Sequence, residues 1–266
     1  MNSIWLIDAD CEGTRAEELQ AEIRRRGFEY RPVKFFPERR YPGDIAGAES
    51  IPLDARVLFF GGPALMHHIQ NHRRWRPGGW CAFANFSCHV YYCYFGAHLL
   101  NKNYALLPAS EALRQSTILF DTYAKSGNVF VRPSVGRKTF TGGLVDRDGF
   151  ANTLARVDPQ SLIVISAPKD IGREWRLYIA ADEIVSHSQY ACRGELAVSR
   201  ECPAEVLAFG ASLLRETTWR PDPLFTMDIC ELDGRLRLVE LNGFSCSNLY
   251  KCDLEPLLTA ASVAAT

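Results

Sequence analysis

The sequence predicts an α/β lobe at the N-terminus, followed by a longer α+β region with antiparallel sheets. Three observations lead to this fold class. The stretches "SIWLID", "RAEELQAEIRRRG" and "EYRPVKF" follow the order strand, amphipathic helix, strand. The run "ARVLFF" then passes through Gly61 and Gly62 into a second helix that begins near Pro63. After about Leu107 the pattern changes to paired strands and hairpins, which is typical of α+β folds.

The boundary between these parts is expected in "LNKNYALLPAS", where the first pattern pauses. Residues 1–106 form the expected N-terminal domain, and residues 107–266 form a second domain with lobes of about 107–167 and 168–266. In that second domain, "NVFVRPSVGRKTFTGGLV" reads as strand, loop and strand, and "SLIVISAP" as a core strand. The stretches "EWRLYIAADEIVSHSQY" and "LFTMDICELDGRLRLVELN" read as hairpins on either side of a helix at "PAEVLAFGASLLRET".

The composition is that of an ordinary globular protein. The 266 residues include 30 Lys and Arg against 31 Asp and Glu, so no global field recruits nucleic acid or an anionic membrane. A partner must therefore be recognised locally, as a small molecule or a peptide. The N-terminus reads as neither a signal peptide nor a membrane span, and nine scattered cysteines favour reduced thiols, so we expect a cytoplasmic protein. The oligomeric state stays open.

Gly61 and Gly62 join a strand to a helix N-terminus. Backbone N–H groups at such a junction can bind a carboxylate or a phosphate. A tight turn without a ligand is the more common case. The third glycine of a dinucleotide fingerprint is missing.

Two acids and an amide lie on the last predicted hairpin. The pair Asp233 and Gly234 is a strong turn signal that brings Asp228 near Glu240. Strand alternation places Glu240 and Asn242 on one face. A two-residue turn would oppose Asp228 to the residue before Glu240 and put the acids on opposite faces, whereas a three-residue loop would put them on the same face. Two carboxylates and an amide suit Mg²⁺ shared with substrate phosphates; a solvent-facing hairpin with incidental acids is the alternative.

A cationic, glycine-containing loop follows an apolar strand that ends at Arg132. Its hydroxyl, glycine and cationic side chains could fold over a polyphosphate, although two chance cations on a surface loop would look the same. In "REWRLYI", Glu174 and Arg176 share a strand face, a pattern that is more often a surface ladder. The loop residues are Ser134, Gly136, Arg137, Lys138, Thr141, Gly142 and Gly143.

In this order, the features from roughly Leu107 to Tyr250 resemble the ATP-grasp superfamily. The resemblance implies two α+β lobes that grip ATP, and an α/β lobe in front of them. It also implies ATP and Mg²⁺ as cofactors. Most members of the superfamily activate a carboxylate as an acyl phosphate before an amine or thiol attacks it.

The resemblance assigns roles to individual residues. Asp228, Glu240 and Asn242 match the magnesium ligands, and Arg176 matches the arginine that meets the γ-phosphate or acyl phosphate. Arg132 stands where a lysine is usual, as in a subgroup of bacterial and phage proteins, and arginine keeps the charge for phosphate. With Arg176, the expected catalytic residues are Lys138 and Arg132. The expected ATP contacts are Arg132, Lys138, Ser134, Thr141, Gly142, Glu174 and the hinge residues Val164, Ile165, Ser166 and Ala167.

These assignments lead to a predicted function. We expect an ADP-forming ligase that joins a carboxylate on a small molecule or peptide to an amine. Two alternatives are a small-molecule kinase on the same scaffold and a regulatory module that binds the nucleotide without turnover. No nucleic acid or membrane partner is expected.

Overall fold

A computed structural model gives the fold, and it describes residues 3–11, 15–136 and 139–265. By its internal contacts the chain divides into two compact units, each described here by itself. The predicted boundaries near residues 107 and 168 stay predictions. The first unit contains Met1–Ala82, Arg173–Ile229 and Glu240–Thr266, and the second contains Phe83–Gly172 and Cys230–Val239.

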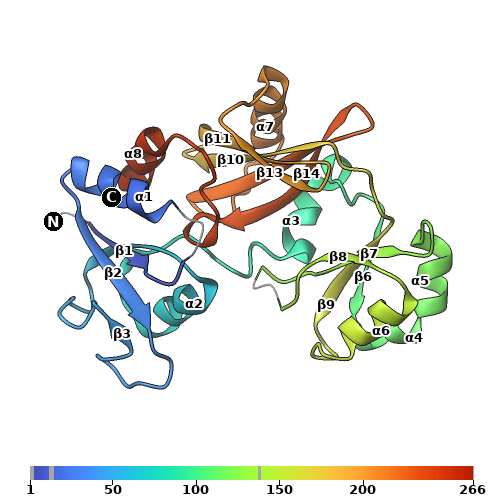
Figure 1. Ribbon diagram of the computed structural model, residues 1–266, viewed down its shortest axis with the longest axis horizontal. Helices are drawn as coiled ribbons and strands as arrows, with labels where there is room; N and C mark the ends of the chain where they lie inside the picture. The colour runs from blue at the N-terminus through green and yellow to red at the C-terminus, as the bar shows by residue number, and fades with distance from the viewer. Residues whose placement is uncertain (1–2, 12–14, 137–138, 266) are drawn as a thin grey trace. The chain divides into compact units, whose positions relative to one another are not determined.

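The N-terminal part of the first unit is a mostly parallel sheet (Figure 1). Its elements are β1 (Ile4–Asp8), α1 (Ala16–Arg25), β2 (Glu29–Phe35), β3 (Ile45–Ala46), β4 (Arg56–Phe60), α2 (Pro63–His72) and β5 (Arg76–Gly78). The strand order is β3-β2-β1-β4-β5, in which β1 pairs in parallel with both β2 and β4. The strand–helix–strand opening predicted from the sequence is therefore present.

A second sheet in the first unit carries the predicted late hairpin. The strand order is β12-β11-β10-β13-β14, and β11 is antiparallel to both of its neighbours. The mixture of a parallel lobe with antiparallel sheets confirms the predicted fold class. The elements are β10 (Arg173–Ala180), β11 (Glu183–Cys192), β12 (Glu195–Ser199), α7 (Ala204–Glu216), β13 (Leu224–Leu232), β14 (Arg235–Gly243), the short 3₁₀ helix η2 (Phe244–Cys246) and α8 (Leu254–Ala264).

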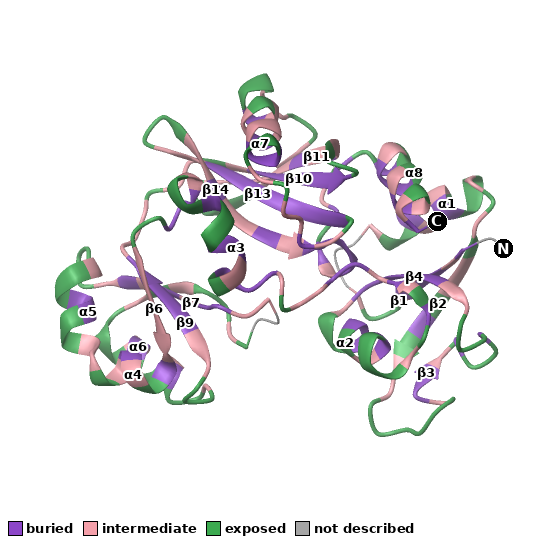
Figure 2. Cartoon of the chain, turned by 180° about the vertical axis from the view of Figure 1, so that it is seen from behind, coloured by how far each residue is buried: buried purple, intermediate pink, exposed green. Residues whose placement is uncertain are grey.

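One hydrophobic core joins the two ends of the chain within the first unit. Trp5 and Leu19, from β1 and α1, belong to the same buried cluster as Tyr178 from β10 and Leu257 from α8. Figure 2 shows the buried residues along β10 and β13 and on the inner sides of α1 and α8. The N-terminal sheet and the C-terminal helix therefore stabilise each other through shared apolar burial.

Helix α7 packs closely on one face of the second sheet. Gly210 is buried in this contact, and a Cβ atom there would lie 2.5 Å from Leu177 Cδ1. The same Cβ would lie 3.3 Å from Ile184 and 3.5 Å from Ile229, so glycine lets the helix approach the strands. The opposite face of the sheet carries the side chains of Glu174 and Arg176 and becomes the candidate site below.

The second unit is built on an antiparallel sheet with strand order β6-β9-β7-β8. Buried side chains of this sheet and of the helices beside it, among them Val131, Phe150 and Ile163, form its core. The elements are α3 (Cys88–Phe95), the 3₁₀ helix η1 (Gly96–His98), β6 (Tyr104–Pro108), α4 (Ala109–Arg114), α5 (Ser116–Tyr123), β7 (Val129–Pro133), β8 (Gly143–Val145), α6 (Arg147–Leu154) and β9 (Leu162–Ser166).

Two further expectations can be compared with the described residues. All nine cysteines are free thiols, as the sequence predicted. Within the described part of the chain, no helix is long and apolar enough to cross a membrane.

Candidate active site

The late hairpin turns in two residues. Asp233 and Gly234 both have positive φ, 51° and 69°, and β14 begins directly after them. The three-residue loop that would place both acids on one face is therefore absent. Along β14 the buried residues include Leu238 and Leu241, an odd spacing that breaks strand alternation. A β-bulge has this effect, and we infer that it, rather than the turn, re-aims Glu240.

Arg176 and Asp228 form a buried ion pair on this sheet. Arg176 Nε donates to Asp228 Oδ1 at 2.8 Å, and Nη2 donates to Oδ2 at 2.7 Å. Arg176 is 7% exposed and Asp228 is 1% exposed. Burial disfavours the charged guanidinium, but the carboxylate of Asp228 outweighs it and raises the pKa of Arg176 well above its usual range. The guanidinium therefore stays charged in a fixed orientation.

Glu174 lies in the same electrostatic neighbourhood. Tyr190 donates its hydroxyl hydrogen to Glu174 Oε2 at 2.7 Å. Burial raises the pKa of Glu174, against the effect of this hydrogen bond. The charges of Asp228 and Glu240 raise that pKa further. Asp228 and Glu240 thus act on the same group, and three acidic side chains lie near one another on this sheet.

Two tyrosines that were not predicted border the pair. The rings of Tyr190 and Tyr250 stack with centroids 5.1 Å apart and planes 12° apart. The guanidinium carbon of Arg176 lies 5.8 Å and 5.2 Å from these two ring centroids. Cation–π attraction therefore adds to the ion pair with Asp228 in holding the arginine. The predicted hairpin beside Glu174 was a signal for Tyr190, because Glu174 pairs with Ala191 across it. Nothing comparable points to Tyr250.

Glu240 and Asn242 face the same side, as strand alternation predicted. Asn242 donates its amide hydrogen to Glu240 Oε1 at 2.9 Å, so the amide orients the carboxylate. Within the described residues, no group of three or more His, Cys, Asp or Glu side chains is arranged to hold a metal ion. Mg²⁺, however, usually takes only one or two carboxylates together with substrate phosphates and water. The hard oxygen donors of Asp228, Glu240 and Asn242 fit that requirement.

The glycine turn of the N-terminal sheet binds a carboxylate of its own chain. Gly62 N–H donates to Asp8 Oδ2 at 3.0 Å, and Gly61 N–H donates to the carbonyl of Ser245 at 2.8 Å. A Cβ at position 61 would lie 2.2 Å from Asp8 Cβ, which explains the glycine. Both N–H groups are therefore used internally, and the interpretation of this turn as an anion site for a ligand is wrong. Sequence reasoning missed Asp8.

The predicted phosphate-binding residues belong to the second unit. Arg132 lies on β7 opposite Val164, and a Cβ on Gly142 would lie 2.8 Å from Arg132 Cβ, so glycine is needed there. Ser134 is 1% exposed, and its hydroxyl lies 3.1 Å from His89 Nδ1. Thr141 and Gly142 are exposed. The predicted lysine of this loop, Lys138, lies outside the described residues.

The predicted adenine hinge lies at the end of a central strand. Val164 and Ile165 pair with β6 on one side and β7 on the other. Their backbone groups are therefore committed to the sheet, which narrows the hinge prediction toward Ser166 and Ala167. Glu174 belongs to the first unit and is bonded as described above.

Lys169, next to the predicted hinge, was missed by sequence reasoning. Its ammonium donates to Asn101 Oδ1 at 2.7 Å, Ala167 O at 2.9 Å and Ser166 Oγ at 3.3 Å. Burial, reinforced by the charge of Lys125, lowers its pKa to about 8. Its only sequence signal was its position directly after the core strand "LIVIS".

Comparisons with known proteins agree on one family. A family model described as an ATP-grasp domain, the second family of its clade, matches residues 112–260. No curated protein matches the chain.

Several solved structures share the fold at low sequence identity. The ATP-grasp ligase PsnB, complexed with a minimal precursor, has a TM-score of 0.59 and 16% identity over 100% of both chains. The D-alanyl-alanine synthetase A of Vibrio cholerae has a TM-score of 0.63 and 13% identity over 99% of this chain and 96% of its own. The D-alanine–D-alanine ligase of Bacillus anthracis has a TM-score of 0.59 and 15% identity over 99% of this chain and 93% of its own.

Proposed function

Because the chain belongs to the ATP-grasp superfamily, we propose that it is an ADP-forming ligase that joins a carboxylate to an amine. ATP and Mg²⁺ are the cofactors of this reaction, as the resemblance implied. Solved ligases of similar fold include PsnB in complex with Mg and ADP and the Bacillus anthracis ligase in complex with ATP. PsnB has also been solved in complex with a precursor peptide, which supports a small acid or a peptide as substrate class.

The observation that carries the proposal is the fixed, charged guanidinium of Arg176 beside the acidic face of the late hairpin. Asp228 takes two of its N–H groups, and Nη1 lies 3.2 Å from the carbonyl of Asn248. A preorganised cation stabilises negative charge that develops during phosphoryl and acyl transfer, without having to reorganise at that moment. Arg176 is therefore the proposed catalytic residue of this sheet.

Asp228, Glu240 and Asn242 are the proposed ligands of Mg²⁺. When bound, the metal supplies Lewis-acid neutralisation of the phosphate oxygens. Asn242 orients Glu240 through their 2.9 Å hydrogen bond. Tyr190 holds Glu174, the residue proposed to contact the nucleotide, through its hydroxyl. Arg132 and Lys138 are proposed to hold phosphate oxygens, and the segment at Ser166 and Ala167 to hold adenine.

The reaction class can be tested by product mass. The protein is incubated with ATP, Mg²⁺ and a pool of amino acids and short peptides, and the products are weighed by mass spectrometry. Ligation adds the masses of two substrates minus one water, whereas a kinase adds a phosphate-sized mass. Hydroxylamine is added in parallel, because it intercepts an acyl phosphate as a hydroxamate.

Matched variants make the outcome specific to the site. Arg176→Lys keeps a positive charge but loses the two-point contact with Asp228, so we expect turnover to fall by about a hundredfold or more. Arg156→Lys, an exposed arginine on the second unit, should leave turnover unchanged. A phosphorylated acid that survives isolation and yields no hydroxamate would replace the ligase with the kinase alternative. ATP binding without any product across a broad pool would favour the regulatory alternative.

A further inference from the structure

The outer edge of β11 is only partly paired. On one side, β10 pairs with β11 along its whole length, from Glu183 to Cys192. On the other side, β12 pairs with Gln189, Ala191 and Cys192. Among the described residues, no strand pairs with the outer edge of Glu183–Ser188. Since backbone groups in a strand alternate sides, about half of those in this segment point away from β10, and such an edge is a template for another strand.

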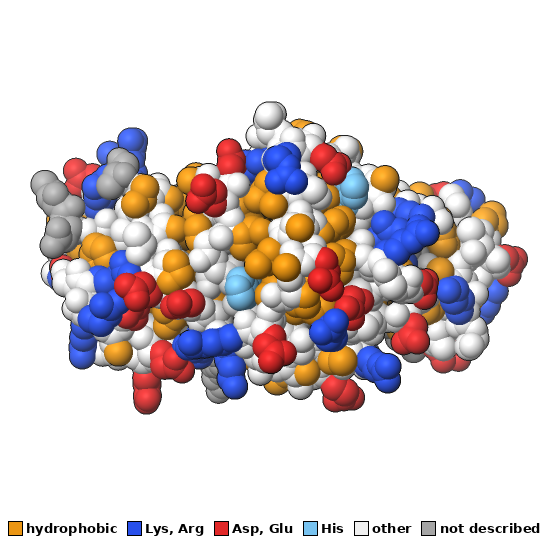
Figure 3. Space-filling view, turned by 90° about the horizontal axis from the view of Figure 1, so that it is seen from above, with side chains coloured by type: hydrophobic (Ala, Val, Ile, Leu, Met, Phe, Trp, Pro, Cys, Tyr) orange, Lys and Arg blue, Asp and Glu red, His pale blue; other side chains and the backbone are white. Residues whose placement is uncertain are grey.

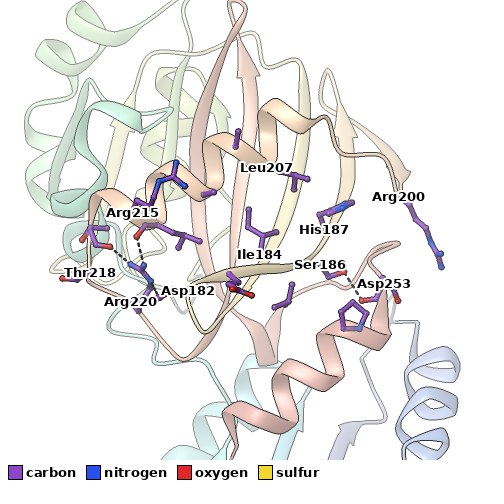
Figure 4. Close-up of a pocket in the computed structure, with 17 residues that line it drawn as sticks. Asp182, Ile184, Ser186, His187, Arg200, Leu207, Arg215, Thr218, Arg220 and Asp253 are labelled. Carbon is purple, nitrogen blue, oxygen red and sulfur yellow. Dashed lines mark hydrogen bonds and ion pairs between the residues drawn. The ribbon is translucent and has the colours of Figure 1, made fainter.

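A cavity of about 1130 Å³ lies along this open edge, between α7 and the start of α8 (Figure 4). The consecutive residues Asp182–His187 line it from β11 and the turn before it. Leu207 and Leu214 line it from α7, while Asp253 and Pro256 line it from the start of α8. The two helices therefore form the walls of a groove, and the strand edge lies between them.

The groove is apolar on the side of α7 and charged at its ends. Ile184, Leu207 and Leu214 give it an aliphatic wall. Arg215 lies on the last turn of α7, and Arg200 lies at the opposite end of the groove (Figure 4). Seen from the side of α7, hydrophobic side chains gather in the middle of the surface, with charged side chains around them (Figure 3). An occupant would be apolar in its middle and polar at its ends.

Some of the charged groups already serve the fold. Arg220 donates to Asp182 at 2.6 Å and to the carbonyl of Leu214 at 2.7 Å, which fixes the end of α7. Asp253 accepts from Glu255 N–H and so caps α8. Arg215, by contrast, is exposed and lines the groove. Among the described residues, the buried Nδ1 atom of His187 has no hydrogen-bond partner, which leaves a polar atom at the edge for an occupant.

We propose that the open edge of β11 binds an extended peptide by strand addition. About six residues of the peptide would lie beside Glu183–Ser188, in line with β12. Alternate side chains would be apolar and face Leu207 and Leu214, and an acidic side chain would meet Arg215. This binding site is separate from the proposed reaction and does not depend on it.

The dimensions favour a single peptide strand over other occupants. Ligand pockets for small molecules are typically about 300–1,000 Å³, and this groove, at about 1130 Å³, is larger. The row of backbone groups along Glu183–Ser188 also suits a partner that offers backbone groups at the same spacing. A second copy of the sheet would bring its own α7 and α8 to the edge, whereas one extended strand can enter between the helices.

The test uses a seven-residue peptide of alternating valine and threonine with a glutamate at each end. Binding to the full chain is measured by titration calorimetry, and amide hydrogen exchange is followed with and without peptide. We expect protection confined to Glu183–Ser188 and its immediate neighbours. A peptide of the same sequence with alternate backbone nitrogens methylated should not bind, because it lacks the N–H groups of a strand edge.

Variants of the groove separate this mode of binding from nonspecific association. Ala211→Glu places a charge in the aliphatic wall and should weaken binding at least tenfold. Arg215→Glu should weaken it about fivefold or more, and a lysine-ended peptide should then bind the variant better than the glutamate-ended one. Arg156→Glu, outside the groove, is the charge-matched control and should not change the affinity.

Four results would overturn the proposal. They are no binding up to about 1 mM peptide, equal binding of the methylated peptide, protection elsewhere in the chain, and protection of Glu183–Ser188 by concentration-dependent dimerisation without peptide. Each can be read whether or not the protein is a ligase, since none of these measurements involves turnover.

Discussion

Arg176 and Asp228 meet through two parallel hydrogen bonds, Nε to Oδ1 at 2.8 Å and Nη2 to Oδ2 at 2.7 Å. Their side chains are only 8% and 2% exposed. A buried charge without its partner is costly, so each residue depends on the other for stability. In the proposed reaction the same contact orients the catalytic guanidinium. Stability and chemistry therefore meet in one pair.

The first prediction concerns this pair. Arg176→Met and Asp228→Leu should each lower the free energy of unfolding by about 3–5 kcal/mol, because each leaves one buried charge unpaired. The double variant should lose less than the sum of the two, since it leaves neither charge. Urea denaturation of the four proteins measures this coupling. Losses that simply add would show that the two side chains do not depend on each other.

The second prediction concerns metal. Glu240→Ala should remove the Mg²⁺ dependence of binding for a non-hydrolysable ATP analogue, because it deletes a proposed ligand. Titration calorimetry with and without Mg²⁺ measures the effect, and Glu195→Ala, an exposed acid on β12, is the control. If the folded Glu240 variant and the wild type gain equally from Mg²⁺, Glu240 is not a metal ligand.

The third prediction concerns pH. Burial is the main cause that raises the pKa of Glu174 in the folded protein, so the native state binds more protons than the unfolded state. Stability must then fall as pH rises from the unfolded pKa, about 4.3, through the higher folded value. Glu174→Gln should flatten this decline and be more stable than wild type at neutral pH. Denaturation midpoints recorded against pH give the comparison; a parallel decline in the variant would assign it to other groups.

The fourth prediction concerns Lys169, whose pKa burial lowers to about 8. Its amine should react with an acylating reagent with a pH midpoint near 8. Labelling rates from peptide mass spectrometry test this, with exposed Lys102 as an internal reference. Because the folded pKa is lowered, the folded protein is disfavoured below pH 8 and regains stability as pH rises toward the unfolded value of about 10.4. Lys169→Met should therefore reduce the rise in stability over this interval.

The fifth prediction compares two glycines. A Cβ on Gly243 would lie 2.6 Å from the Cα and Sγ atoms of Cys81, while a Cβ on Gly143 would meet nothing within 4 Å. Gly243→Ala should destabilise the protein by about 1–3 kcal/mol through overpacking. Gly143→Ala should be neutral or slightly stabilising. Thermal unfolding of both variants decides the point, and equal melting temperatures would show that the end of β14 can yield.

The sequence predicted those features that depend on neighbouring residues. The turn at Asp233 and Gly234 follows from local backbone preference, and the shared face of Glu240 and Asn242 follows from strand alternation. The family was also predictable, because the order of its motifs survives when each motif alone is weak. These inferences need no knowledge of what packs against each element.

Other features depend on tertiary contacts and could not be read from the sequence. Tyr190 and Tyr250 stack although 60 positions separate them, and the irregularity of β14 depends on what buries Leu238 and Leu241. The glycine turn looked like a ligand site because its actual partner, Asp8, lies on a different strand. Burial of Lys169 has no local pattern at all.

The shared core of the first unit sets an order for folding during synthesis. Its strands and helices come from the first 82 residues and from segments that end at residue 266, so the early part must wait for the last part. At about 5–20 residues per second, the ribosome needs on the order of 10–30 s to travel from residue 82 to residue 240. During that time the apolar faces of β1 and α1 lack the helix α8 that covers them. Most of the second unit, Phe83–Gly172, is by contrast one continuous segment with mainly short-range contacts. Chaperone dependence and loss of the last helix should therefore affect the N-terminal sheet first.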